Sequence, residues 1–277
     1  MNTEVFAAAG IRHAYTWLRS CRGGFTASAL AATALLLAAS PALTDHAWQN
    51  YHLARKTNPV LLKVGDNVTS AWDSYLTEAI ADWSASSLLD LTKVTGGTRP
   101  KNCRPTSGRI EVCNAWYGYN GWLGIAQVWI SGGHITQGVV KLNDTYFSTK
   151  TYNTFQWKSL VMCQEIGHTI GLDHNDENFA TDDTGTCMDY TRTPGGNEDP
   201  NAHDYQQLQT IYAHLDSTTT VKTKAAAAPS TDDGGESPAD WGRAVAFTAD
   251  GKPRVFLKRL GNGRWLRTHV TWIEGRP

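Results

Sequence analysis

The sequence predicts an α+β domain, with a leader before it and a small β module after it. Short apolar runs separated by Gly-rich and Asn-rich turns predict strands, and segments with apolar residues at helical spacing predict helices. Residues 217–240 are rich in Thr, Ala, Ser, Asp, Gly and Pro, which is typical of a flexible linker. With 277 residues, 41% of them hydrophobic, the chain is long enough for one large domain and is not of disordered composition.

Residues 1–42 have the features of a signal peptide. Three arginines precede an apolar run from Phe25 to Ala39, and the small residues Ser40 and Ala42 occupy the positions that signal peptidase reads. This run of about 15 residues is shorter than the roughly 20 that a bilayer requires. We therefore expect cleavage after Ala42, a secreted, extracellular protein and no stable membrane span. An uncleaved anchor is the alternative.

Five strands are expected within residues 43–216, the main domain. Each is a short apolar run, and Gly-rich and Asn-rich turns separate them. They span residues 60–64, 88–94, 109–115, 125–130 and 138–142.

Three helices are expected in the same domain. Residues 72–83 carry apolar side chains at helical spacing after a possible cap at Ser70. A second helix begins near Asn153 or Thr154 and ends near Gly171. The third spans residues 201–215.

Residues 241–277 are expected to form a separate, basic β module. An Asp-Gly pair between the runs 244–247 and 254–257 predicts a hairpin, and residues 264–272 predict another strand. The module has a net charge of about +6, against about −9 for residues 43–240. It could bind an anionic surface or fold back on the acidic domain. The whole chain has 25 Lys and Arg against 26 Asp and Glu, which gives no case for nucleic-acid binding.

The segment QEIGHTIGLDH carries the most chemical information. Gln164 and His168 are four residues apart, so on a helix their side chains project from one face. Gly171 can end that helix in a left-handed conformation, which would bring His174 back toward the same point. Glu165 lies beside this set. The pattern indicates a metal site formed by one helix and the turn after it.

This segment resembles the signature of the metzincin clan of zinc peptidases, H-E-x-x-H-x-x-G-x-x-H followed by a methionine turn. Gln164 stands in place of the first histidine. The sequence TCMDY resembles the methionine turn, and Tyr190 follows Met188 by two residues, as in astacin-type members. The resemblance covers roughly residues 58–215. It implies a zincin-like domain with a mixed twisted sheet, an active-site helix, a methionine turn and a C-terminal helix.

The resemblance also implies roles for these residues. Gln164, His168 and His174 would bind Zn²⁺. Glu165 would act as general base toward a zinc-activated water, and Tyr190 would stabilise the oxyanion.

Two further implications concern the surroundings of the metal. Met188 would form an apolar floor beneath it, and Gly171 would supply the turn before the third ligand. The substrate-binding edge strand of the family falls on Gly124 to Ile130, where a polypeptide would add as a further strand. We expect the protein to be a monomer.

Gln164 leaves three interpretations open, because an amide oxygen is a weaker donor to zinc than an imidazole nitrogen. It binds zinc through its oxygen, it lies beside the metal while water fills the vacancy, or the site is degenerate and non-catalytic. Asp173 is a rival to His174 as the third ligand. We expect His134 at the rim of the cleft and a structural role for His203.

The mature chain has four cysteines, an even number that suits an oxidising compartment and permits three pairings. We favour Cys103 with Cys113, which would close a local loop. The resemblance favours Cys163 with Cys187, because it places the active-site helix beside the methionine turn.

Two functions therefore remain open. The first is a secreted zinc endopeptidase, which Glu165 favours because a purely structural zinc site needs no carboxylate there. The second is an exported peptide-binding protein on a catalytically degenerate metzincin scaffold.

Overall fold

The computed structural model describes residues 46–176, 183–221 and 234–273, which belong to one compact unit, residues 43–277. The predicted signal peptide and the middle of the predicted linker lie outside the described residues. Among those described, no helix has both the length and the apolar character needed to cross a membrane.

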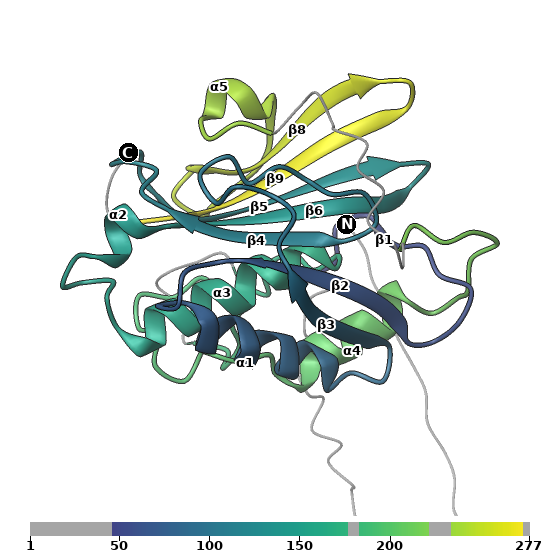
Figure 1. Ribbon diagram of the computed structural model, residues 1–277, viewed down its shortest axis with the longest axis horizontal. Coiled ribbons are helices and arrows are strands. Elements are labelled where there is room, and N and C mark those ends of the chain that lie inside the picture. Colours follow the sequence, from purple (N-terminus) through teal and green to yellow (C-terminus); the bar gives the residue numbers. More distant parts are fainter. Residues whose placement is uncertain (1–45, 177–182, 222–233, 274–277) are drawn as a thin grey trace, which may run out of the picture. The chain divides into compact units, whose positions relative to one another are not determined.

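A mixed β-sheet forms the centre of the described chain (Figure 1). Its strand order is β3-β2-β4-β6-β5-β9-β8-β7, and β1 pairs with β6 outside this path. Strands β2, β3, β4 and β6 run parallel, whereas β5 is antiparallel to both β6 and β9. The strands are β1 His52–Leu53, β2 Val60–Asn67, β3 Leu89–Thr95, β4 Ile110–Ala115, β5 Trp122–Ser131, β6 His134–Asn143, β7 Arg243–Phe247, β8 Pro253–Gly261 and β9 Arg264–Trp272.

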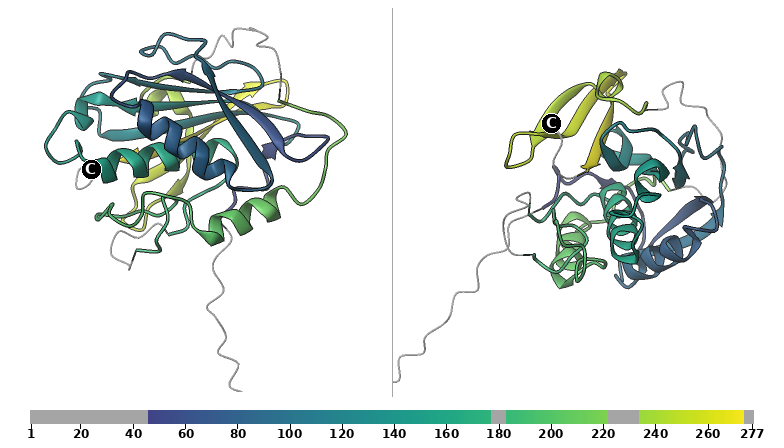
Figure 2. Two further views of the ribbon diagram at one scale, coloured as in Figure 1. Left: turned by 60° about the horizontal axis from the view of Figure 1, so that its bottom comes forward. Right: turned by 90° about the vertical axis from the view of Figure 1, so that its left-hand side faces the viewer.

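Helices cover the sheet and confirm the predicted α+β class. Helices α1, α3 and α4 lie on one side of the sheet and α5 on the other (Figure 1). Helices α1 and α3 lie side by side (Figure 2), and both contribute buried apolar side chains to the main core. The helices are α1 Asp73–Ser84, α2 Asp144–Phe147, α3 Phe155–Thr169, α4 Ala202–Ile211 and α5 Pro238–Trp241.

Side-chain caps explain where two of these helices begin. The hydroxyl of Thr154 accepts a hydrogen bond from the first turn of α3, and Asn201 makes a capping box at the start of α4. The cap expected for α1 is wrong. Ser70 lies in a turn closed by a bond from Trp72 N to Thr69 O, and the helix begins only after Trp72.

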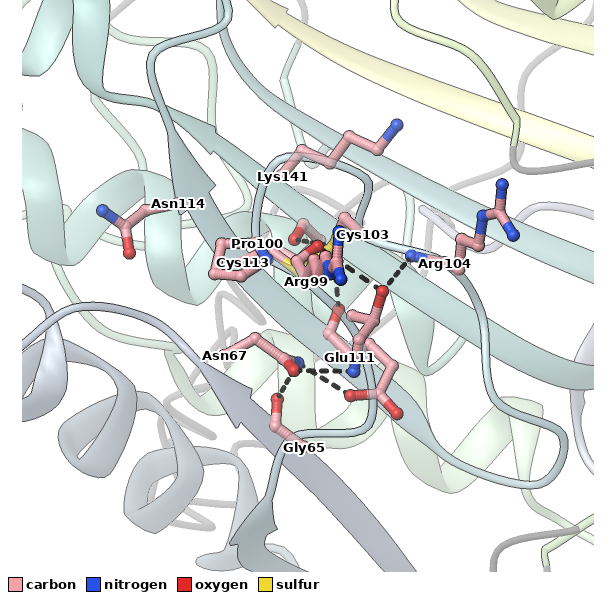
Figure 3. The surroundings of a disulfide bond; sticks show 12 residues. Gly65, Asn67, Arg99, Pro100, Cys103, Arg104, Glu111, Cys113, Asn114 and Lys141 are labelled. Carbon is pink, nitrogen blue, oxygen red and sulfur yellow. Dashed lines mark hydrogen bonds between the residues drawn. A yellow bond between two sulfur atoms is a disulfide. The ribbon is translucent and has the colours of Figure 1, made fainter. Parts of the chain in front are cut away.

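The Cys103–Cys113 disulfide joins the loop before β4 to β4 itself, in the pairing favoured from the sequence (Figure 3). Beside it the fully buried carboxylate of Glu111 accepts hydrogen bonds from Asn67 Nδ2 at 2.7 Å and from Arg109 Nε at 2.6 Å. A buried carboxylate is tolerated only with such partners. The network therefore fixes this loop against β2 and β4.

The prediction that residues 241–277 form a separate module is wrong. Strand β9 pairs with β5 along its whole length, so β7, β8 and β9 continue the central sheet. Trp241 and Phe256 pack with Trp122 and Ile125 in an apolar cluster. A hairpin pattern specifies two strands but not the edge they join. Here the C-terminal hairpin joins the edge of β5 that would otherwise be open, and the apolar cluster packs against it.

Hydrogen exchange tests this arrangement. We expect the backbone amides of β9 to be protected about as well as those of β6, because β9 is paired throughout and its residues 266–271 are buried. Native-state exchange followed by mass spectrometry on residues 43–277 measures this. Fast exchange throughout β8 and β9, with β5 and β6 protected, would instead indicate a separate module.

Candidate active site

Helix α3 places the predicted metal motif inside the core, since residues 159–169 are all buried. Gly171 follows with a φ of +111°, and a Cβ there would lie 2.5 Å from the carbonyl oxygen of Tyr51. Glycine alone fits this turn without strain. The chain returns so that His174 faces His168, with their Nε2 atoms 3.2 Å apart.

Hydrogen bonds define the protonation of these two imidazoles. His168 Nδ1 lies 2.9 Å from the carbonyl oxygen of Leu172, so this nitrogen donates and Nε2 keeps a lone pair. His174 Nδ1 lies 3.3 Å from Nη1 of Arg254, which can only donate. Burial lowers the pKa of His168 to about 4. Burial, aided by His168 and Arg254, holds the pKa of His174 well below its usual range. Both rings are therefore neutral at pH 7.

In this closed form Nε2 of His174 carries its ring proton and donates it to Nε2 of His168, while Gln164 is held by other groups. Two nitrogens bound to one tetrahedral zinc are about 3.3 Å apart, close to the 3.2 Å observed. Gln164 Nε2 donates to the carbonyl oxygens of Cys187 and Asp189 at 2.8 and 3.0 Å. Its Oε1 accepts a bond of 2.7 Å from the hydroxyl of Thr271. The structure thus brings two of the three predicted donors to a spacing that a metal could bridge, once Arg254 leaves Nδ1 of His174 and the proton on its Nε2 is displaced.

Glu165 is fully buried between α3 and β5. A Cβ on Gly124 would lie 2.4 Å from its Oε1, so the carboxyl group has room only because this position of β5 is glycine. Burial raises the pKa of Glu165 to about 8. In this conformation the carboxyl is mostly protonated at pH 7.

The segment with Met188 is fixed to the underside of α3. The Cys163–Cys187 disulfide, the second pairing favoured from the sequence, joins the helix to this segment. Met188 packs so closely against Gly167 that a Cβ there would lie 2.5 Å from its sulfur. The helix and the segment beneath it therefore form one rigid support.

Tyr190 lies against the second imidazole. Its ring centroid is 4.3 Å from that of His174, and its hydroxyl donates to the carbonyl oxygen of Val270 at 3.0 Å. Burial, with a contribution from Glu165, raises the pKa of Tyr190 well above its usual value. The hydroxyl therefore keeps its proton and remains a hydrogen-bond donor.

Strand β9 contributes site residues that sequence reasoning missed. Arg267, His269 and Thr271 stand at alternate positions and so project from the same face of the strand. The ring of His269 stacks on that of His168, with centroids 4.2 Å apart and an angle of 18° between the planes. In the sequence, this alternation of polar residues is the signal that one face of β9 contacts polar groups.

Asp173 serves as the counter-ion of strands β8 and β9. Its carboxylate is 2.6 Å from Nη1 of Arg254 and 3.4 Å from Nη2 of Arg267. Burial alone would raise the pKa of Asp173, but the two guanidinium groups hold it below its usual value. Asp173 is thus engaged and does not face the metal position as a free ligand. The basic C-terminal segment folds back on the acidic domain.

The remaining predictions for this region need correction. The stretch from Gly124 to Ile130 is not a free edge, because β5 pairs with β6 on one side and with β9 on the other. His134 does not lie at the rim of this site. It stands at the start of β6, with its ring 4.9 Å from that of His52. His203, at the start of α4, contacts His46, which agrees with a structural role.

Comparison with known proteins gives weak similarities. No protein-family model and no curated protein matches the sequence. Among solved structures, myroilysin is 16% identical with a TM-score of 0.36, over 58% of this chain and 96% of that one. High choriolytic enzyme 1, a hatching enzyme zinc-protease from Oryzias latipes (medaka), is 12% identical with a TM-score of 0.35, over 60% of this chain and 96% of that one. These values are too low to assign the chain to a family.

The raised pKa of Glu165 predicts a pH dependence of stability. The folded state holds the proton up to about pH 8, whereas the unfolded chain releases it near its usual value of about 4.3. Stability from this group is therefore complete below about pH 4 and is lost as the pH rises toward 8. We expect the wild type to lose more stability than Glu165→Gln between pH 5 and 8, measured by urea unfolding with a chelator present. Equal losses would contradict the burial of this carboxyl.

Proposed function

We propose that this chain is a secreted zinc endopeptidase in a latent form, in which β9 takes the place of the polypeptide substrate. The pairing of β9 with β5 carries the proposal, because an extended peptide added to β5 would use the same main-chain groups. The resemblance of the QExxHxxGxxH motif to the metzincin signature supplies the reaction class. Two disulfides and the predicted leader support secretion.

Strands β8 and β9 contact the three proposed ligands and Tyr190. Glu165 lies beside the two strands. The pairs are Thr271 with Gln164, Val270 with Tyr190, Arg254 with His174, and His269 with His168. Release of the two strands would free an oxygen lone pair of Gln164 and the hydroxyl of Tyr190. It would also return water to Glu165, which favours the ionised carboxylate that a base requires.

In the open form, the proposed ligands are His168, His174 and the oxygen of Gln164. Bound zinc would act as a Lewis acid and would supply hydroxide near neutral pH. Glu165 would take a proton from the attacking water and pass it to the leaving amine. Tyr190 would donate a hydrogen bond to the oxyanion that develops on the substrate carbonyl.

Hydrolysis of an unfolded protein tests this proposal. A protease site inserted within residues 222–233 allows the chain to be cut before β7 to β9. If fewer than about a tenth of the intact molecules are in the open form, cutting should raise the rate of hydrolysis at least about tenfold. A chelator should abolish hydrolysis, and Glu165→Ala should be inactive in both forms.

The uncut chain with the same insertion is the matched control. Equal rates before and after cutting would contradict latency. Absence of hydrolysis from the cut, zinc-loaded chain would contradict the peptidase and favour the second function.

That second function is peptide binding without catalysis, on the same scaffold. The hydrogen bonds of Gln164 favour it, because all three use the side chain for protein contacts. The bound peptide would again lie along β5, as β9 does.

Substitution at Gln164 tests its place beside the metal. We expect Gln164→His in the cut chain to bind zinc at least about tenfold more tightly, because imidazole is the stronger donor. Competition with a chromophoric chelator measures the affinity. Gln209→His, at an exposed position of α4, is the matched control. An affinity that does not change would place residue 164 outside the coordination sphere.

A further inference from the structure

Three histidines surround the carboxylate of Asp216 on a part of the fold that the proposed function does not use. One comes from β1, one from the start of β6, and one lies between α4 and Asp216. They are His52, His134 and His214. We call these four residues the Asp216 cluster.

The same ring nitrogen of each histidine is directed at the carboxylate. Oδ2 of Asp216 is 3.3 Å from Nε2 of His52. Oδ1 is 3.5 Å from Nε2 of His214 and 3.9 Å from Nε2 of His134. One ligand atom each from His52, His214 and Asp216 all lie within 4.8 Å of one another. The donor atoms of these three residues thus converge on one point, and His134 lies at the edge of the group.

Hydrogen bonding orients the most buried imidazole for a cation. His52 Nδ1 lies 2.7 Å from the carbonyl oxygen of Asn50, an acceptor, so Nδ1 donates. With Nδ1 committed to that carbonyl, only Nε2 of His52 faces the carboxylate of Asp216, so a cation placed between them would contact both. A histidine that donates its other nitrogen to a backbone carbonyl is the usual arrangement around a bound metal.

The carboxylate is held equally firmly. Asp216 Oδ2 accepts a hydrogen bond from the backbone nitrogen of Arg55 at 2.9 Å, and the nitrogen of Asp216 donates to the carbonyl oxygen of Arg55 at 2.8 Å. Arg55 Nη1 also donates to the carbonyl oxygen of His214 at 2.8 Å, which fixes the segment that carries the outermost ligand. Preorganised ligands of this kind lose little freedom when a metal binds.

Solvent can reach the cluster from one side. The side chains of His52 and Asp216 are 5% and 7% exposed, whereas those of His134 and His214 are 27% and 61% exposed. A metal ion could therefore enter past His214 and become enclosed by the inner pair.

We propose that the Asp216 cluster is a metal site for Zn²⁺ or a similar divalent transition ion, distinct from the candidate active site. Imidazole nitrogens with one carboxylate oxygen form a donor set that suits zinc. His52, His214 and Asp216 would supply three ligands, and His134 stands beside them with its Nε2 3.9 Å from the carboxylate. The ion would join β1 to the segment after α4, beside the start of β6. The proposal does not depend on the peptidase function.

Zinc binding to the metal-free mature chain tests the proposal. Residues 43–277 are stripped with a chelator and reloaded with Zn²⁺ alone, and zinc content and affinity are then measured. We expect the wild type to hold one more zinc per chain than His214→Ala, whose exposed position leaves the fold intact. Asp216→Asn, which keeps the size of the side chain, should weaken this binding at least about tenfold. His203→Ala, a histidine of α4 outside the cluster, should bind like the wild type.

Cobalt provides a second measurement. Co²⁺ bound to the wild type should give the visible absorption of a tetrahedral site, and His214→Ala should lose that part of the spectrum. The proposal is overturned if His214→Ala and Asp216→Asn match the wild type in zinc content, zinc affinity and cobalt spectrum, or if the wild type takes up no zinc that His214→Ala lacks.

Discussion

The main-chain pairing of β9 with β5 is the interaction on which the rest of the site depends. It covers the edge of β5, which would otherwise expose a row of unpaired backbone groups. It also sorts the side chains of β9 by face. Val270 turns toward the apolar cluster around Trp241, while His269 and Thr271 turn toward α3. One strand thereby completes the sheet and closes the candidate active site.

Closure is also electrostatic. Arg254 and Arg267 bring two cations next to neutral imidazoles, and the carboxylate of Asp173 compensates both. Removing paired charges from water costs nearly as much as their attraction returns, so such pairs give specificity more than stability. The charged pairs therefore set where β8 and β9 lie, while the strand pairing and the buried apolar side chains hold them there.

Much of this structure could be predicted because it is encoded locally. The Thr154 and Asn201 caps, the apolar alternation of the strands and the Gly171 turn each depend on neighbouring residues. The partner of the C-terminal hairpin could not be predicted in this way, because two equally good strands can join any free edge. The contact of Thr271 with Gln164 spans 107 residues. The Asp216 cluster was missed for the same reason, since His52 and Asp216 are 164 residues apart.

The central claim is that β9 itself keeps the site closed, and a disulfide between β5 and β9 tests it most directly. Gln127 and Thr268 face each other across the two strands, and their side chains are hydrogen bonded at 3.2 Å. In the chain cut within residues 222–233, the double variant Gln127→Cys and Thr268→Cys should stay inactive when oxidised, while each single variant should hydrolyse an unfolded protein. A cross-linked chain as active as the single variants would show that β9 does not block the site.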